Sequence, residues 1–230
     1  MSLPPPRGPL GVLVSGGLDS SILLANYLTN GIAVQPLYIR TGTVWQAAEL
    51  AHLRRFLQRI ADPRLAPLVC FEMPLADVYG GHWSMTGEAV PGAETSDEAV
   101  YLPGRNALLL LKASVWCQLN GIQQLALAPL AGNPFADATP EFFAAFQAMI
   151  NLSASPPLSI LRPFATLDKV QVMRLGRNFP LEETFSCIAP VRGNHCGQCN
   201  KCAERRLAFL SADLPDPTRY AGTSRLAQIR

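Results

Sequence analysis

Short apolar runs alternate along the chain with longer segments in which apolar residues recur every three or four positions. The short runs have the length of strands, and we expect five strands, at residues 11–14, 34–39, 66–73, 124–128 and 159–162. The longer segments predict helices, at residues 20–27, 44–61, 107–119, from 141 onwards, 167–177 and 199–210. This alternation predicts an α/β fold with an open, parallel, five-stranded sheet and helices on both of its faces.

Two segments add detail to this pattern. The helix expected at 44–61 has an apolar inward face, formed by Trp45, Leu53, Phe56, Leu57 and Ile60. Residues 74–100 are polar and are interrupted by several glycines. A connection of this length is uncommon in a compact domain and is typical either of a functional lid or of a disordered segment.

Length, composition and charge limit the number of domains and the kinds of partner that we expect. With 230 residues, 49% of them hydrophobic, the chain can bury one sizeable core, and we expect a single domain over residues 1–230. The 19 basic and 17 acidic residues give a net charge of +2, which argues against extended nucleic-acid binding. Residues 1–9 do not have the pattern of a signal peptide, and the apolar segment 107–119 contains Lys112 and is too short to cross a bilayer. We therefore expect a cytoplasmic protein that does not enter a membrane.

Four of the six cysteines lie close together near the end of the chain, with the spacing C-x8-C-x2-C-x2-C, at Cys187, Cys196, Cys199 and Cys202. This spacing can place four thiolates around a tetrahedral Zn²⁺, and in a reducing compartment a metal explains them better than disulfides do. Four thiolates leave no position for water, so we expect one structural zinc per chain, held by a subregion at 185–212. The alternative is four unligated cysteines.

The residues next to this motif, and the two cysteines outside it, are expected to have structural rather than catalytic roles. We expect His195 to be a loop residue rather than a fifth ligand. The helix at 199–210 is expected to dock on the domain through Leu207, Phe209 and Leu210. The other two cysteines, Cys70 and Cys117, lie in apolar surroundings and are expected to be buried core thiols.

A glycine-rich loop follows the first expected strand, and its candidate ligand-binding residues are Ser15, Gly16, Gly17, Leu18, Asp19, Ser20 and Ser21. Ligands of open parallel sheets bind beyond the carboxyl ends of the strands, where this loop lies. The glycines allow phosphate oxygens to approach the backbone N–H groups, and the serine hydroxyls can add donors at a helix N-terminus. A carboxylate such as Asp19 can ligate Mg²⁺ or orient the loop. The patterns G-x-x-x-x-G-K-[ST] and G-x-G-x-x-G do not occur in the chain. The alternative is an ordinary strand-to-helix turn.

The run Ser15-Gly-Gly-Leu-Asp-Ser20 resembles the phosphate-binding loop of the PP-loop ATP pyrophosphatases. The resemblance implies an adenine nucleotide alpha hydrolase-like fold and cleavage of ATP, with Mg²⁺, between the α and β phosphates. A carboxylate, amide or carbonyl oxygen is then adenylated, and a nitrogen or sulfur nucleophile displaces AMP. The four-cysteine spacing and the run Tyr101-Leu-Pro-Gly-Arg-Asn106 are similar to those of the 7-cyano-7-deazaguanine synthases of queuosine biosynthesis.

That family implies a ligase that joins a small-molecule carboxylate, 7-carboxy-7-deazaguanine, to ammonia, and a homodimer. No glutaminase cysteine motif is visible, so we expect free ammonia as the nitrogen donor. Besides Asp19 and Ser20, the candidate catalytic residues are Arg105, after a Pro-Gly turn at a helix start, and Lys169, in the first turn after the fifth strand. The alternative for both cations is a solvated surface charge. Asn106 is a candidate helix N-cap.

Two stretches depart from the synthase pattern, both where the acceptor substrate is expected to be chosen. Residues 39–46 replace a run of aspartate, tyrosine, glycine and glutamine, and residues 132–140 replace an acidic run that contains tyrosine. Within these stretches Trp45, Phe135 and Asp137 could stack on a deazaguanine ring or bond its edge. A relative that adenylates another carboxylate, a tRNA or a protein is the alternative. A non-catalytic zinc-ribbon module is less favoured, because only Lys201, Arg205 and Arg206 supply positive charge near the cysteines.

Overall fold

The computed structural model describes residues 9–221 and confirms the predicted sheet. Five parallel strands lie in the order β3-β2-β1-β4-β5, namely β1 (Leu10–Leu13), β2 (Val34–Arg40), β3 (Val69–Glu72), β4 (Gln124–Ala126) and β5 (Ser159–Leu161). The strand order reverses between β1 and β4, and this is the place where open α/β sheets bind ligands. Residues 1–8, on which the signal-peptide argument depends, lie outside the described part of the chain.

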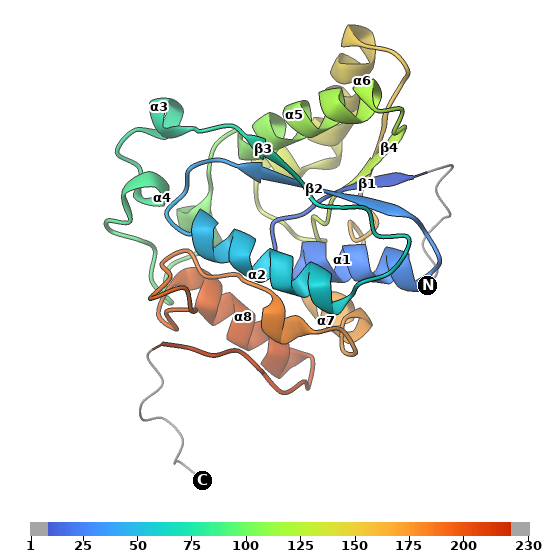
Figure 1. The fold of residues 1–230 in the computed structure, drawn as a ribbon. Helices are drawn as coiled ribbons and strands as arrows, with labels where there is room; N and C mark the ends of the chain where they lie inside the picture. The colour runs from blue at the N-terminus through green and yellow to red at the C-terminus, as the bar shows by residue number, and fades with distance from the viewer. Residues whose placement is uncertain (1–8, 222–230) are drawn as a thin grey trace.

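Helices cover both faces of the sheet, as Figure 1 shows. One face carries α1 (Leu18–Thr29), α2 (Gln46–Arg59), α7 (Lys169–Leu175) and α8 (Asn200–Ser211). The other face carries α5 (Arg105–Leu119) and α6 (Pro140–Ser153). The shorter elements are α3 (Ala76–Tyr79), α4 (Trp83–Thr86), η1 (Asp97–Val100), η2 (Ala136–Ala138) and η3 (Leu181–Glu183). Among the helices of residues 9–221, none has both the length and the apolar character that crossing a membrane requires.

Side chains of β1 alternate between the two cores of the molecule. Leu10 and Val12 are fully buried in the core beneath α1 and α7. Gly11 faces α5, and a Cβ atom there would lie only 3.0 Å from Cys117 Sγ. The absence of a side chain at Gly11 therefore lets α5 pack closely on the sheet. Cys117 is the buried core thiol that the sequence predicts, and burial raises its pKa to about 12.

Two expectations about burial are wrong. Cys70 is exposed, because β3 is an edge strand whose side chains are only partly covered. Leu207 and Leu210 are 61% and 78% exposed, whereas Phe209 is buried. Cys202 and Arg205 are also buried and lie on the same face of α8 as Phe209, so this helix turns the two leucines outward.

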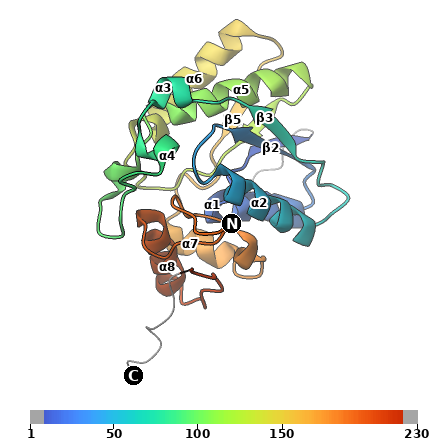
Figure 2. The same cartoon turned by 60° about the vertical axis from the view of Figure 1, so that its left-hand side comes forward.

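The segment 74–100 is folded rather than disordered. It contains α3, α4 and η1, and it packs against the start of α8. The Asn200 backbone N–H donates to the Pro91 carbonyl at 2.9 Å, and the Asn200 side-chain amide donates to the Thr95 carbonyl at 2.8 Å. Figure 2 shows this segment passing beside the four-cysteine region on its way to α5. The segment thus joins the cysteine turn to the helix that carries Arg105.

Candidate active site

The glycine-rich loop joins β1 to α1 at the carboxyl end of the sheet. Gly16 has a φ of +77°, and Gly17 is the N-cap of α1. Within the loop, the Ser15 N–H donates to Ser20 Oγ at 3.1 Å, and the Gly17 N–H donates to Ser15 Oγ at 3.3 Å. The first-turn N–H groups of a helix have no partners inside the helix, so this loop can present them to an anion.

Replacing Gly16 by alanine is expected to destabilise the loop by about 1–2 kcal/mol, because its positive φ is strained for a residue with a Cβ atom. The new Cβ would also lie 3.3 Å from the Glu49 carbonyl oxygen and from Leu53 Cβ. Chemical denaturation checks the stability, and ATP titration checks the accompanying loss of affinity. Gly81→Ala is the control, since Gly81 has open space around it and no positive φ. Equal stability of the two variants would contradict the expected strain.

A cleft of about 370 Å³ opens in front of the loop. The candidate residues that line it are Ser15, Gly17, Leu18, Asp19, Ser20, Arg105 and Lys169. Gly16 is not part of the lining, and neither is Ser21, whose hydroxyl is buried without a hydrogen-bond partner among the described residues. The structure therefore brings both expected cations to the same cleft as the loop, although they come from opposite faces of the sheet.

Lys169 lies in an ion-pair network at one edge of the cleft. Its Nζ donates to both carboxylate oxygens of Asp19, at 2.7 and 2.9 Å, and lies 3.2 Å from Glu204 Oε1. Burial by itself lowers the pKa of Lys169, but the two carboxylates outweigh burial and raise it, so the side chain is cationic. Lys169 is therefore a cation paired with Asp19 and Glu204 rather than a freely solvated one.

Arg105 enters the cleft from the first turn of α5. Its Nε is buried without a hydrogen-bond partner among the described residues, so this donor is free for a ligand. Gly104, not Asn106, is the N-cap of α5. The Asn106 N–H instead donates to Asp137 Oδ2 at 3.0 Å, and its side-chain amide donates to the Asp137 carbonyl at 2.9 Å. Asp137 thus fixes the helix start that positions Arg105.

Glu49 is a site residue that the sequence analysis missed. It is 8% exposed, lines the cleft, and accepts a hydrogen bond from the Tyr38 hydroxyl at 2.9 Å. Burial raises its pKa to about 7, against the opposing effects of Arg105 and the hydrogen bond from Tyr38. Its position four and seven residues before Leu53 and Phe56 places it on the inward stripe of α2. An acidic residue on the apolar, inward stripe of this helix is the sequence feature that could have identified Glu49 as a site residue.

The raised pKa of Glu49 predicts a pH-dependent stability. The unfolded chain ionises Glu49 near pH 4.5, whereas the folded protein keeps this carboxyl protonated and neutral up to about pH 7. Stability is therefore lost as pH rises through this window, and Glu49→Gln is expected to exceed the wild type by on the order of 3 kcal/mol above it. Urea unfolding of both proteins between pH 4.5 and 8 measures the difference. A difference that does not change with pH would contradict this assignment.

Four aromatic side chains form part of the cleft wall. Tyr101 and Phe135 stack with ring centroids 5.0 Å apart, and Trp45 and Trp83 stack at 5.7 Å. All four rings line the cleft. Two of them, Trp45 and Phe135, come from the stretches that depart from the synthase pattern. A flat heteroaromatic group fits such surroundings.

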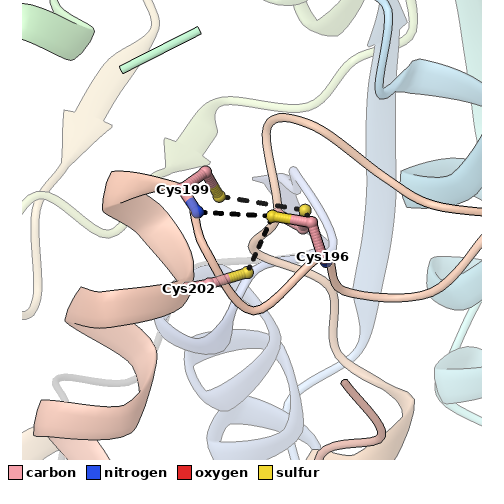
Figure 3. A group of neighbouring side chains, drawn as sticks. Cys196, Cys199 and Cys202 are labelled. Carbon is pink, nitrogen blue, oxygen red and sulfur yellow. Dashed lines mark hydrogen bonds between the residues drawn. The ribbon is translucent and has the colours of Figure 1, made fainter. Parts of the chain in front are cut away.

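The four cysteines form a buried cluster beside the cleft. All four sulfur atoms lie within 4.8 Å of one another, with Cys196 Sγ 3.9 Å from Cys202 Sγ and Cys199 Sγ 3.8 Å from Cys187 Sγ. Figure 3 shows the sulfurs of the three labelled cysteines pointing toward a common centre, with Cys202 on α8. Tetrahedral bonds of about 2.3 Å to one zinc would separate the sulfurs by about 3.8 Å, so the donor set fits this metal.

Backbone amides support the cluster. The Cys196 N–H donates to Cys187 Sγ at 3.2 Å, and the Cys199 N–H donates to Cys196 Sγ at 3.3 Å. Such bonds stabilise thiolates. His195 is 2% exposed, and its Nε2 accepts from the Ser186 N–H at 3.1 Å while burial lowers its pKa to about 3. It is therefore a neutral, buried residue of the loop between Cys187 and Cys196, and the metal-binding cluster consists of the four cysteines without it.

The parallel five-stranded sheet, with a glycine-rich loop between β1 and α1, has the arrangement expected for the PP-loop ATP pyrophosphatases. The solved structure of a 4-thiouridine synthetase–RNA complex with bound ATP has the same fold, with a TM-score of 0.52 and 15% sequence identity. That match covers 93% of this chain and 47% of the synthetase chain, so this chain corresponds to about half of the synthetase's length. At this identity the likeness shows the fold alone.

The sequence then gives the family. Residues 11–213 match the family described as queuosine biosynthesis protein QueC, and the chain belongs to that family. A 7-cyano-7-deazaguanine synthase from Thiobacillus denitrificans is 32% identical over 91% of this chain and 97% of its own length. The synthase of the same name from Frankia casuarinae is 33% identical over 92% of this chain and 94% of its own length.

Proposed function

We propose that the protein is a 7-cyano-7-deazaguanine synthase, an ATP-dependent ligase of queuosine biosynthesis. The observation that carries this proposal is the similarity to synthases of that name over nearly the whole chain, with the glycine-rich loop and the four-cysteine cluster both within the matched residues. The substrates would be 7-carboxy-7-deazaguanine, ATP and ammonia. The site is proposed to work in the cytoplasm, within a single domain at 1–230 whose metal-binding subregion spans 185–212.

In the proposed reaction, a carboxylate oxygen of the substrate attacks the α-phosphorus of ATP, and pyrophosphate leaves. The loop N–H groups, Ser15, Ser20 and Lys169 would bind the phosphates, and Arg105 would bind the adenylated carboxylate or the leaving oxygens. Asp19 would ligate Mg²⁺ once the phosphates compete for Lys169. Bound Mg²⁺ would neutralise charge that develops on the phosphate oxygens.

Ammonia then displaces AMP from the acyl-adenylate to give the amide. Adenylation of the amide oxygen by a second ATP, followed by loss of AMP and a proton, leaves the nitrile. Two ATP are consumed for each nitrile, and each AMP carries away one of the two carboxylate oxygens. The aromatic side chains of the cleft would hold the deazaguanine ring and exclude water from both adenylates.

The four-cysteine cluster is proposed to hold one structural zinc per chain. The four buried sulfurs would occupy all four positions of a tetrahedral zinc and leave none for a substrate, and backbone N–H groups donate to the sulfurs. The cluster would therefore support the site without taking part in bond making. We also propose that segment 74–100 acts as a lid over the bound substrates, because its Trp83 and Val100 line the cleft.

A homodimer is proposed as the assembly. Leu111, Val115 and Leu119 form an exposed apolar row on α5, at successive turns of the helix. Light scattering coupled to gel filtration measures the mass in solution, and a monomer across the micromolar range would exclude the dimer.

A second candidate is a relative that adenylates a different acceptor. It is favoured by one observation, that Trp45 and Phe135 line the cleft and come from the two divergent stretches. The test uses purified zinc-loaded protein with ATP, Mg²⁺ and ammonium, with and without 7-carboxy-7-deazaguanine, and follows AMP, pyrophosphate and product mass. AMP formation that depends on the deazaguanine, with appearance of the nitrile, is expected. ATP binding without turnover would favour the second candidate.

A further inference from the structure

Glu204 lies between two lysines at the edge of the cleft. Its Oε1 is 3.2 Å from Lys169 Nζ, and its Oε2 is 2.6 Å from Lys201 Nζ. Lys169 also forms an ion pair with Asp19 in the glycine-rich loop. Lys201 Nζ lies 3.9 Å from Asp97 Oδ1 in the segment 74–100. The five side chains form a row of alternating charge that runs from the loop, across α7 and α8, to the folded segment.

This arrangement keeps two cations together beside a phosphate-binding loop. Two ammonium groups this close would repel each other without the carboxylate between them. Glu204 contacts each lysine with a different oxygen, so either lysine can turn toward an anion in the cleft while the other stays paired. Lys169, Lys201 and Glu204 all line the cleft that the loop borders.

The position of Glu204 depends on the cysteine cluster. Cys199 is the N-cap of α8, and Cys202 lies in its first turn, two residues before Glu204. Holding these two sulfurs fixes the start of the helix, and with it the direction in which Glu204 and Lys201 point. The first turn of α8 and the ion pairs Glu204–Lys169 and Lys169–Asp19 therefore connect the cysteine cluster to Asp19.

A second contact joins the same two sites. The Phe185 N–H donates to the Gly16 carbonyl at 2.7 Å, and Cys187 follows two residues later. Arg205, which is 1% exposed, fastens α8 to this stretch by donating to Thr184 Oγ1 and to the Leu181 carbonyl, both at 2.8 Å. The loop backbone and the loop carboxylate are therefore both held from the metal-binding subregion.

We propose that Glu204 is a positioning residue that holds Lys169 and Lys201 ready for the triphosphate, and that through it the four-cysteine subregion and the ATP site are energetically coupled. This rests on the proposed function in so far as ATP is the ligand. Coupling is reciprocal, so a metal-loaded subregion that favours ATP binding must also bind its metal more tightly when ATP is bound.

Two measurements on the zinc-loaded protein test the proposal, both with Mg²⁺ and the α,β-methylene analogue of ATP, which the enzyme cannot cleave between the α and β phosphates. Calorimetric titration gives the Kd of the nucleotide for the wild type, Glu204→Gln and Lys201→Gln. Equilibrium competition for zinc with a zinc-selective chelator, with and without nucleotide, gives the coupling. Glu141→Gln, the same chemical change at an exposed site on α6, is the matched control.

For Glu204→Gln we expect an approximately tenfold higher Kd, equivalent to about 1.4 kcal/mol, with one zinc retained and an unchanged circular dichroism spectrum. Lys201→Gln is expected to weaken binding about threefold, since it removes one charge-assisted contact at a partly exposed site. Nucleotide should raise the zinc affinity of the wild type and of Glu141→Gln, and this increase should be smaller in Glu204→Gln.

Wild-type or higher nucleotide affinity in Glu204→Gln, or a zinc affinity that nucleotide does not raise in the wild type, would overturn the inference while leaving the proposed function intact. A wild-type protein that binds no nucleotide would overturn both.

Discussion

A Cys202→Ser variant is expected to lose its zinc and at least about 3 kcal/mol of its free energy of unfolding, which is the largest stability effect that we anticipate for a single substitution. Cys202 is fully buried, and its sulfur lies 3.9 Å from Cys196 Sγ. Serine would leave a three-ligand site with a hydroxyl in place of the fourth thiolate. Because a structural zinc site contributes its binding energy to folding, on the order of 10 kcal/mol for small zinc modules, a weakened site is costly.

Metal content by mass spectrometry and the denaturation midpoint of the purified variant measure this effect. Cys70→Ser is the matched control, since Cys70 is exposed on the edge strand and far from the cluster along the chain. The control should keep one zinc and the wild-type midpoint. A Cys202→Ser protein with a full zinc complement and unchanged stability would show that the four cysteines do not form a metal site.

A Lys169→Met variant is expected to lose at least about 100-fold in kcat while it keeps its zinc. Lys169 Nζ lies 2.7 Å from Asp19 and 3.2 Å from Glu204, within the lining of the cleft. Methionine preserves the length of the side chain but supplies no charge to the triphosphate, and it leaves two carboxylates facing each other. Both effects disfavour an additional polyanion, so the KM for ATP should also rise.

Steady-state release of pyrophosphate, measured against ATP concentration, separates the two effects. Lys112→Met is the control, because Lys112 lies on α5 and donates to the Glu72 carbonyl at the edge of the sheet. Its activity should stay within about twofold of the wild type, as is usual for changes away from a site. Wild-type kcat in Lys169→Met would remove this lysine from the catalytic residues.

The features that the sequence predicted well are those determined locally. Ser15–Ser21 follows a short apolar strand, and Cys187, Cys196, Cys199 and Cys202 carry their spacing within one short stretch. The order of elements was also readable, because parallel strands must alternate with covering helices. The expected ends of the strands and helices therefore lie within a few residues of those observed.

The features that the sequence did not predict depend on how distant elements meet. Glu204 is on α8 and Lys169 on α7, so their contact requires the packing of two helices that no local pattern specifies. The outward position of Leu207 has the same origin, because α8 turns the face that carries Arg205 and Phe209 inward. Cys70 was misjudged because the order of the strands, and so the exposure of β3, is a property of the whole sheet.

In the proposed reaction, a carboxylate oxygen of the substrate attacks the α-phosphorus of ATP. The most direct test supplies 7-carboxy-7-deazaguanine with both carboxylate oxygens labelled with ¹⁸O, and analyses AMP and pyrophosphate by mass spectrometry. We predict that every AMP formed carries one ¹⁸O atom, that pyrophosphate carries none, and that two AMP appear for each nitrile. Unlabelled AMP, or label in pyrophosphate or phosphate, would contradict adenylation of the substrate carboxylate and with it the proposed mechanism.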